Sequence, residues 1–288
     1  MRFLTDWIVE WLTEFLIEGI MSNLSGLFDN VNNQVGEIAV TVGMTPGAWN
    51  PGVFNLIRTL SETVVLPIAG ILLTFVMTWE LIQLIIDHNN LNQLDTWIFY
   101  KWVFKTMVAV LILTNTFNIV MGIFDVAQHV VSNAAGIIAG STEVTPATLD
   151  AFRDELMVME VGRLLGLWLQ SFLISIIVVA LNIVVFIIVY GRMIEIYILT
   201  SLAPLPMATL TNSEMSGMGH NYLKSLLAVG FQGLLIMVCV GIYAVLVQSI
   251  ATSGDPIGSI WSAIGITVLL CFTLFKTGSV AKSIFAAQ

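Results

Sequence analysis

Charged side chains are scarce in this chain, since Asp, Glu, Lys and Arg together make up only 10% of its 288 residues. A soluble globular domain carries roughly 25% charged residues, which it needs to cover a water-facing surface. Hydrophobic residues instead reach 57% of this chain. The composition therefore argues against a soluble enzyme and predicts a protein that crosses a membrane several times.

Residues that carry metal or redox chemistry are also few. The two cysteines, Cys239 and Cys271, both lie inside apolar runs, which favours small buried hydrophobes over a disulfide. The three histidines are far apart and show no ligand spacing. The sequence holds no GxSxG, Walker A, HExxH or paired-carboxylate pattern. We therefore predict no enzyme, no metal and no cofactor.

Basic residues are outnumbered by acidic ones, 10 against 19, which gives a net charge of −9. Because phosphate contacts need clustered Lys and Arg, this balance argues against a nucleic-acid-binding domain with a basic face. The N-terminus also lacks the uncharged core of a signal peptide, since an acidic residue recurs every four positions from Asp6 to Glu18. We expect this segment to be retained.

The first 61 residues are predicted to form an extracytoplasmic N-terminal region. Apolar residues over 3–21 recur at helical spacing beside an acidic stripe, which predicts an amphipathic helix. Anionic headgroups would repel that acidic face, so docking against other helices or a partner subunit is favoured over lipid binding. Residues 22–61 are rich in Gly and Asn, with turn signals near Pro46 and Pro51, and predict a surface connection with short helical pieces.

Five long apolar segments predict five transmembrane helices, because a hydrocarbon core of about 30 Å needs roughly 20 residues of helix. They lie near 62–86, 102–124, 164–191, 225–254 and 257–275. The fold class is therefore all-α, a polytopic membrane protein with about five transmembrane helices plus the N-terminal amphipathic helix. The chain is predicted to divide into the N-terminal region 1–61, the first two spans at 62–124, an outer loop at 125–163, and three spans at 164–288.

The basic residues predict which side of the membrane each end occupies. With the N-terminus outside and the C-terminus inside, six of the ten face inwards. They are Lys101, Lys105, Arg192, Lys224, Lys276 and Lys282. The connection 87–101 and the loop 191–222 are then cytoplasmic.

Prolines and glycines shape the loops on both sides. Thr145-Pro146 in the outer loop predicts the start of an amphipathic helix, a natural contact site for a partner. The apolar stretch that ends at 136–140 predicts a re-entrant segment. Pro204 and Pro206 predict a break after the third span, followed by a turn through Gly217 and Gly219.

Polar residues inside spans either join helices or line a hydrated path. Glu80 is the best candidate for a path or partner contact, because it is the only acid within a span. The full set of candidate partner or path residues is Glu80, Lys101, Lys105, Arg192, Glu195, Pro204, Tyr222 and Lys224.

The segment from Arg192-Met-Ile-Glu195 to Ala203-Pro204-Leu205, followed by Asn221-Tyr222, resembles the core of the TrbL-type polytopic subunit of type IV secretion systems. Tyr222 stands where that family often has Trp. The N-terminal half is similar to the Gram-positive conjugative-element branch. This second similarity rests on residues 49–50, 60–70, 95–102 and 116–121.

The resemblance implies a subunit of a conjugation channel in the bacterial cytoplasmic (inner) membrane. Such subunits form homo-oligomers in membrane lipid, contact the system's ATPases and extracytoplasmic components, and can meet the translocated DNA or protein transiently. The family offers no catalytic residues or cofactors to carry over. Two alternatives remain open from the residues themselves, a small-solute permease or channel and a membrane anchor that recruits a soluble partner.

Overall fold

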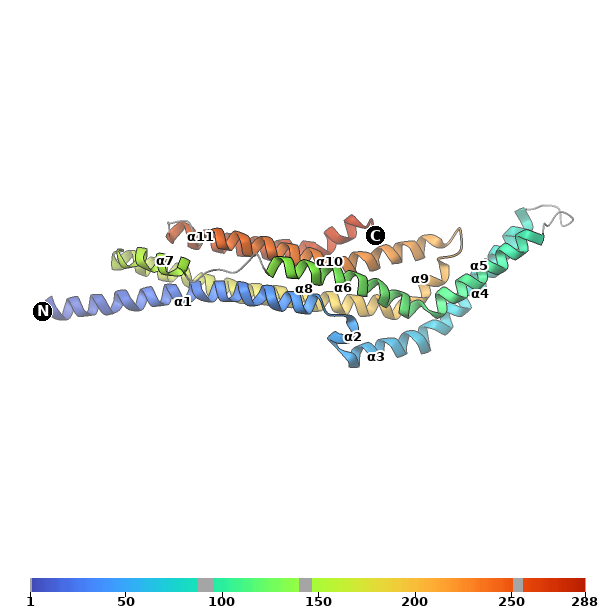
Figure 1. The fold of residues 1–288 in the computed structure, drawn as a ribbon, viewed down its shortest axis with the longest axis horizontal. Helices are drawn as coiled ribbons and strands as arrows, with labels where there is room; N and C mark the ends of the chain where they lie inside the picture. The colour runs from blue at the N-terminus through green and yellow to red at the C-terminus, as the bar shows by residue number, and fades with distance from the viewer. Residues whose placement is uncertain (1, 88–95, 140–146, 251–255, 288) are drawn as a thin grey trace. The chain divides into compact units, whose positions relative to one another are not determined.

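The computed structural model describes residues 2–87, 96–139, 147–250 and 256–287, and within these ranges the chain is helical with no strands (Figure 1). The elements are α1 (Arg2–Val42), α2 (Pro46–Trp49), α3 (Pro51–Leu60), the π-helix η1 (Ser61–Val65), α4 (Leu66–Asp87), α5 (Thr96–Thr114), α6 (Thr116–Ala139), α7 (Ala147–Met157), α8 (Val161–Leu202), α9 (Pro204–Thr209), α10 (Ser216–Ile250) and α11 (Pro256–Ile284).

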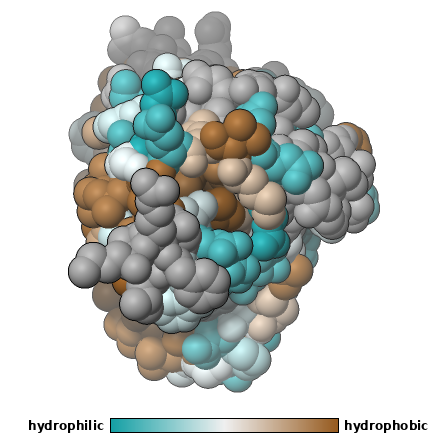
Figure 2. All heavy atoms as spheres, turned by 90° about the vertical axis from the view of Figure 1, so that its left-hand side faces the viewer, coloured by the Kyte–Doolittle hydropathy of each residue, from teal (hydrophilic) through white to brown (hydrophobic). Residues whose placement is uncertain are grey.

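Five helical stretches of the described chain are long and apolar enough to cross a membrane, which confirms the predicted fold class. They are Pro51–Ile86, Thr96–Thr114, Val161–Leu202, Ser216–Ser249 and Trp261–Ile284. Large apolar side chains on these stretches face outwards; Ile71 and Phe272, for example, are 74% and 66% exposed. Hydrophobic surface is also visible on the face shown in Figure 2. Exposed apolar surface of this extent fits contact with lipid.

The second apolar segment differs from its predicted bounds of 102–124. The helix that begins at Thr96 is interrupted at Asn115, and α6 starts at Thr116. The Asn115 amide donates to the Leu111 carbonyl at 2.9 Å, and the Thr116 hydroxyl donates to the Ile112 carbonyl at 3.0 Å. Such side-chain bonds compete with the helical backbone for the same carbonyl oxygens.

The described chain forms two compact units. The first unit comprises Met1–Gly43, Val130–Tyr190 and Leu234–Thr277. The second unit comprises Met44–His129, Gly191–Gly233 and Gly278–Gln288. Several helices, among them α6, α8 and α10, contribute to both units. The sides of the membrane assigned to the predicted loops stay predictions.

In the first unit, α1 runs along α8 (Figure 1). Both helices bury apolar residues at alternating steps of three and four. On α1 the series runs Ile17, Ile20, Leu24 and Leu27. On α8 it includes Leu164, Leu167, Ile174, Leu181 and Val185, with Ser171 at the corresponding polar position. This spacing places the buried residues of each helix on one face, which contributes to a core shared with α10 and α11.

Polar side chains join the same two helices. Asn23 donates to the Ser171 hydroxyl and accepts from the Ser175 hydroxyl, both at 2.9 Å. Asn30 donates to the Asn182 side-chain oxygen at 3.1 Å. Since higher numbers on α1 meet higher numbers on α8, the two helices run parallel. The prediction of a surface connection with short helical pieces is therefore wrong for 22–42, because these asparagines join helices rather than mark a loop.

The second unit contains the α4–α5 hairpin, with α9 packed against it. Before α4, the N–H of Leu66 bonds to the Ser61 carbonyl in the π-helical pattern. Pro67 has no N–H to offer the carbonyl four residues earlier, and the π turn directly precedes it. A separate core in this unit gathers residues of α6, α8 and α10, among them Phe124, Met193 and Leu226.

The loop predictions have mixed outcomes. The predicted break at Pro204 is present, since α8 ends at Leu202 and α9 begins at Pro204. The predicted turn through Gly217 and Gly219 is wrong, because both lie inside α10. Thr145, Pro146 and Gly140 lie outside the described residues, while α6 continues as helix to Ala139 and α7 begins at Ala147.

Gly219 and Gly217 offer a matched test of the packing between α9 and α10. A Cβ on Gly219 would lie 2.9 Å from the Pro206 carbonyl oxygen, whereas a Cβ on Gly217 would meet nothing within 4 Å. We expect Gly219→Ala to lower the free energy of unfolding by about 1–3 kcal/mol through overpacking. Gly217→Ala should be neutral or slightly stabilising. Thermal unfolding in detergent checks this, and equal midpoints for the two variants would contradict it.

Candidate functional site

A partly buried charge pair joins the two arms of the α4–α5 hairpin. Glu80 on α4 is only 9% exposed, and its carboxylate forms an ion pair with the ammonium group of Lys105 on α5. Asn212, which follows α9 and is 1% exposed, donates to the other Glu80 oxygen at 3.4 Å. Burying a carboxylate is costly unless a cation and hydrogen bonds satisfy it. The two predicted residues Glu80 and Lys105 are therefore brought together, and Asn212 is a third member that the sequence did not reveal.

Further polar contacts extend this cluster along the hairpin. The Trp102 indole donates to the Met77 carbonyl at 3.2 Å, which adds a second link between α5 and α4. Gln83, one turn after Glu80, donates to the Glu214 carboxylate at 2.7 Å. The side-chain oxygen of Asn212 also accepts hydrogen bonds from the backbone N–H groups of Glu214 and Met215, both at 2.9 Å. The hairpin is thus tied to the turn between α9 and α10 by a connected set of hydrogen bonds.

Arg192 lies inside the protein rather than on a basic surface, since it is only 2% exposed. Its Nε donates to the Val229 carbonyl and its Nη2 to the Gly230 carbonyl, both at 3.1 Å. Both carbonyls belong to α10, so the guanidinium fastens α8 to α10 through two backbone acceptors. Gly230 also permits α6 to approach, because a Cβ there would lie 3.2 Å from the Ala127 side chain.

The remaining predicted residues do not form one site. Glu195 pairs with Lys282 at 3.1 Å, half exposed to solvent, where ion pairs contribute little. The Tyr222 hydroxyl donates to the Leu199 carbonyl at 3.0 Å and links α10 to α8. Pro204 is buried at the start of α9, and Lys101 and Lys224 are exposed.

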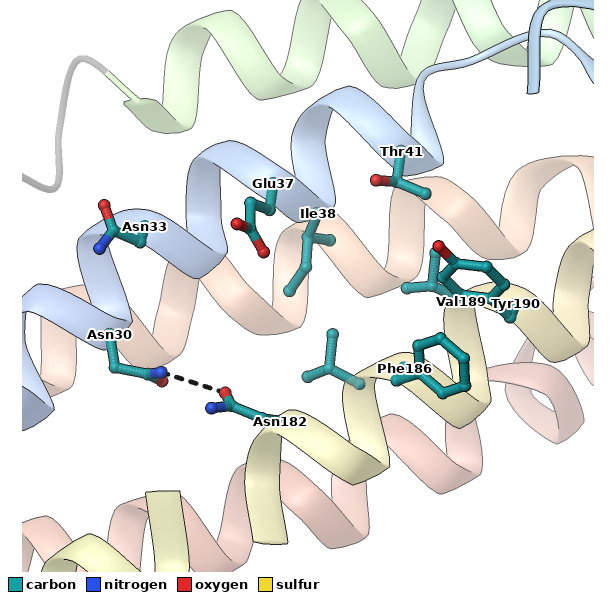
Figure 3. A pocket seen from close by; sticks show the side chains of 10 residues that line it. Asn30, Asn33, Glu37, Ile38, Thr41, Asn182, Phe186, Val189 and Tyr190 are labelled. Atoms are coloured by element: carbon teal, nitrogen blue, oxygen red, sulfur yellow. Dashed lines mark hydrogen bonds between the residues drawn. The ribbon is translucent and has the colours of Figure 1, made fainter. Parts of the chain in front are cut away.

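Sequence reasoning missed a polar cleft between α1 and α8 in the first unit (Figure 3). The cleft has a volume of about 500 Å³ and is lined by Asn30, Asn33, Glu37, Ile38, Thr41, Asn182, Val185, Phe186, Val189 and Tyr190. A usable signal exists in the sequence, because Asn23, Asn30 and Glu37 recur every seven residues on one edge of α1.

These features define an all-α, multi-pass membrane protein whose interior polar groups fasten helices to one another. Residues 31–204 match the family described as TrbL/VirB6 plasmid conjugal transfer like protein. Because the match covers more than half of the chain, the protein belongs to this family, which confirms the resemblance. Membership implies a subunit of a conjugal transfer, type IV secretion system in the inner membrane. No curated protein and no solved structure matched the chain.

The Glu80–Lys105 pair is expected to hold the hairpin together. Glu80→Gln removes the counterion of Lys105, whose side chain is 34% exposed, and this should cost about 1 kcal/mol of stability. The reversed pair Glu80→Lys with Lys105→Glu should recover part of that loss. The measurement is thermal unfolding of the purified protein in detergent.

The matched control is Glu62→Gln, which removes the exposed pair between Arg58 and Glu62. Exposed ion pairs of this kind contribute little to stability, so the unfolding midpoint of Glu62→Gln should stay near that of the native protein. A reversed pair no more stable than Glu80→Gln alone would show that the charge pairing is not what stabilises the hairpin.

Proposed function

We propose that this protein is a channel and scaffold subunit of a conjugative DNA-transfer machine, which assembles as a homo-oligomer and contacts the machine's ATPases and extracytoplasmic components. The observation that carries the proposal is the family match over residues 31–204, together with the apolar outer surface of the spans. The residues that we singled out hold helices together or lie exposed, which favours a role in assembly over catalysis.

Within this proposal the α4–α5 hairpin is a rigid contact element. Its two helices are held by the Glu80–Lys105 pair, and Asn212 ties them to the turn after α9. A preordered element loses less conformational freedom when it docks on a partner such as an ATPase. Lys101 and Lys224 are exposed in the same unit and supply basic groups for a transient contact with translocated DNA or protein.

We further propose that the N-terminus lies outside and the C-terminus inside. The distribution of Lys and Arg supports this orientation.

Reporter fusions test the orientation. An enzyme that is active only outside the cytoplasm should be active on the N-terminus and inactive on the C-terminus, and a cytoplasmic fluorescent reporter should give the reverse pattern. Reporters that place both termini on one side would overturn the proposal. Comparable membrane levels of all fusions serve as the control.

Clean in-frame deletion of the gene tests the function. Transfer frequency from the native host should fall by orders of magnitude, while growth stays normal and plasmid complementation restores transfer. Unchanged transfer would overturn the proposal and favour the alternative of a small-solute permease.

A second experiment tests the proposed contacts. In the complemented strain, cross-linking followed by purification should recover homo-oligomers together with a system ATPase. Recovery of the subunit alone would contradict the proposed contacts.

A further inference from the structure

The cleft between α1 and α8 carries an incomplete set of polar contacts. Along one edge of α1, Asn23 and Asn30 each meet polar groups of α8. Seven residues after Asn30 comes Glu37, where the α8 wall instead offers Phe186 and Tyr190 (Figure 3). Glu37 forms no ion pair with any residue in the described part of the chain. A carboxylate therefore lines this cleft without a cation.

A second acceptor at the same place also lacks a donor. The side-chain oxygen of Asn30 is buried and accepts no hydrogen bond, although its amide nitrogen donates to Asn182. A buried polar atom without a partner is costly and commonly marks a site that a water, ion or ligand completes. The Thr41 hydroxyl lies farther along the α1 wall, one helical turn beyond Glu37. The α1 wall thus presents hydrogen-bond acceptors to whatever fills the cleft.

The α8 wall adds two aromatic rings. Phe186 and Tyr190 lie one turn apart, with ring centroids at 4.2 Å and planes inclined by 31°. Aromatic faces attract cations through the ring quadrupole. Carboxylate, amide oxygen and aromatic rings together favour a cationic donor of hydrogen bonds, of which a primary ammonium is the simplest.

Other ligand classes fit this cleft less well. A phosphate or nucleic acid would be repelled by Glu37, and the lining residues include no Lys or Arg. Divalent metals favour several ligating carboxylates or imidazoles, whereas the cleft has one carboxylate. The described residues contain no group of three His, Cys, Asp or Glu that could hold a metal.

The place of the cleft along α8 indicates where the ammonium comes from. Asn182, Phe186 and Tyr190 lie in the last ten residues of the uncharged run that ends at Gly191, and Arg192 follows. The end of such a run marks the transition from hydrocarbon to headgroups, where Tyr residues are enriched. We propose that this cleft binds the ammonium headgroup of an aminophospholipid from the surrounding bilayer. The proposal rests on the packing of α1 against α8 and does not depend on the proposed secretion role.

The test uses the full-length protein purified in detergent and native mass spectrometry with added lipids. Phosphatidylethanolamine should be retained about tenfold better than phosphatidylcholine, whose methylated nitrogen cannot donate hydrogen bonds. Phosphatidylglycerol should be retained no better than phosphatidylcholine. Equal retention of the three lipids, or a preference for phosphatidylglycerol, would overturn the proposal.

Variants then assign the preference to the cleft. Glu37→Gln should remove most of the preference for phosphatidylethanolamine, and Glu14→Gln, an exposed acid elsewhere on α1, should leave it intact. Phe186→Leu, at a side chain that is 56% exposed, should weaken the preference without disturbing folding. An unchanged preference in both cleft variants would overturn the assignment. Displacement of the lipid by millimolar free ethanolamine would overturn the claim that the bound ammonium belongs to a lipid. The cleft would then be a site for small soluble amines.

Discussion

The constraint on which the structure depends is the cost of leaving a polar group unpaired among apolar helices. The chain has few charges, and those it buries are satisfied in a specific way. Glu80 meets Lys105 across a helical hairpin, and Arg192 is satisfied by two backbone carbonyls of α10. Between α1 and α8 the polar contacts are neutral, since Asn23 and Asn30 of α1 hydrogen-bond the side chains of Ser171 and Asn182. Polar partners therefore specify which helices pack together, because apolar contacts alone discriminate poorly in lipid.

As a result, the outward and inward surfaces of each spanning helix differ in composition and in what they contact. The outward surface of the spans is apolar and suits lipid or the apolar face of a neighbouring subunit. The inward surface carries the sparse polar groups and small residues that allow close approach, such as Gly219 beside the Pro206 carbonyl. A multi-pass membrane protein needs both, since its helices must hold one arrangement while their outer faces contact lipid.

Prediction from the sequence succeeded where one residue type has a dominant local effect. The break at Pro204 belongs to this group, since proline cannot continue a helix. Prediction failed where polar residues have two physical uses. The asparagines of 22–42 indicated a surface connection, yet they join α1 to α8, and Asn115 interrupts what hydropathy presented as one continuous span.

By itself the sequence determined the fold class, the apolar stretches and the family, because hydropathy over some twenty residues and a long matched segment are properties of the linear chain. Only the tertiary structure decided the partners of the polar groups. Asn212 lies 132 residues from Glu80, and Asn30 lies 152 residues from Asn182, so no local pattern could pair them. Arg192 illustrates the same limit, because a basic residue at the end of an uncharged run is typical of a membrane surface until the packing of α8 against α10 buries it.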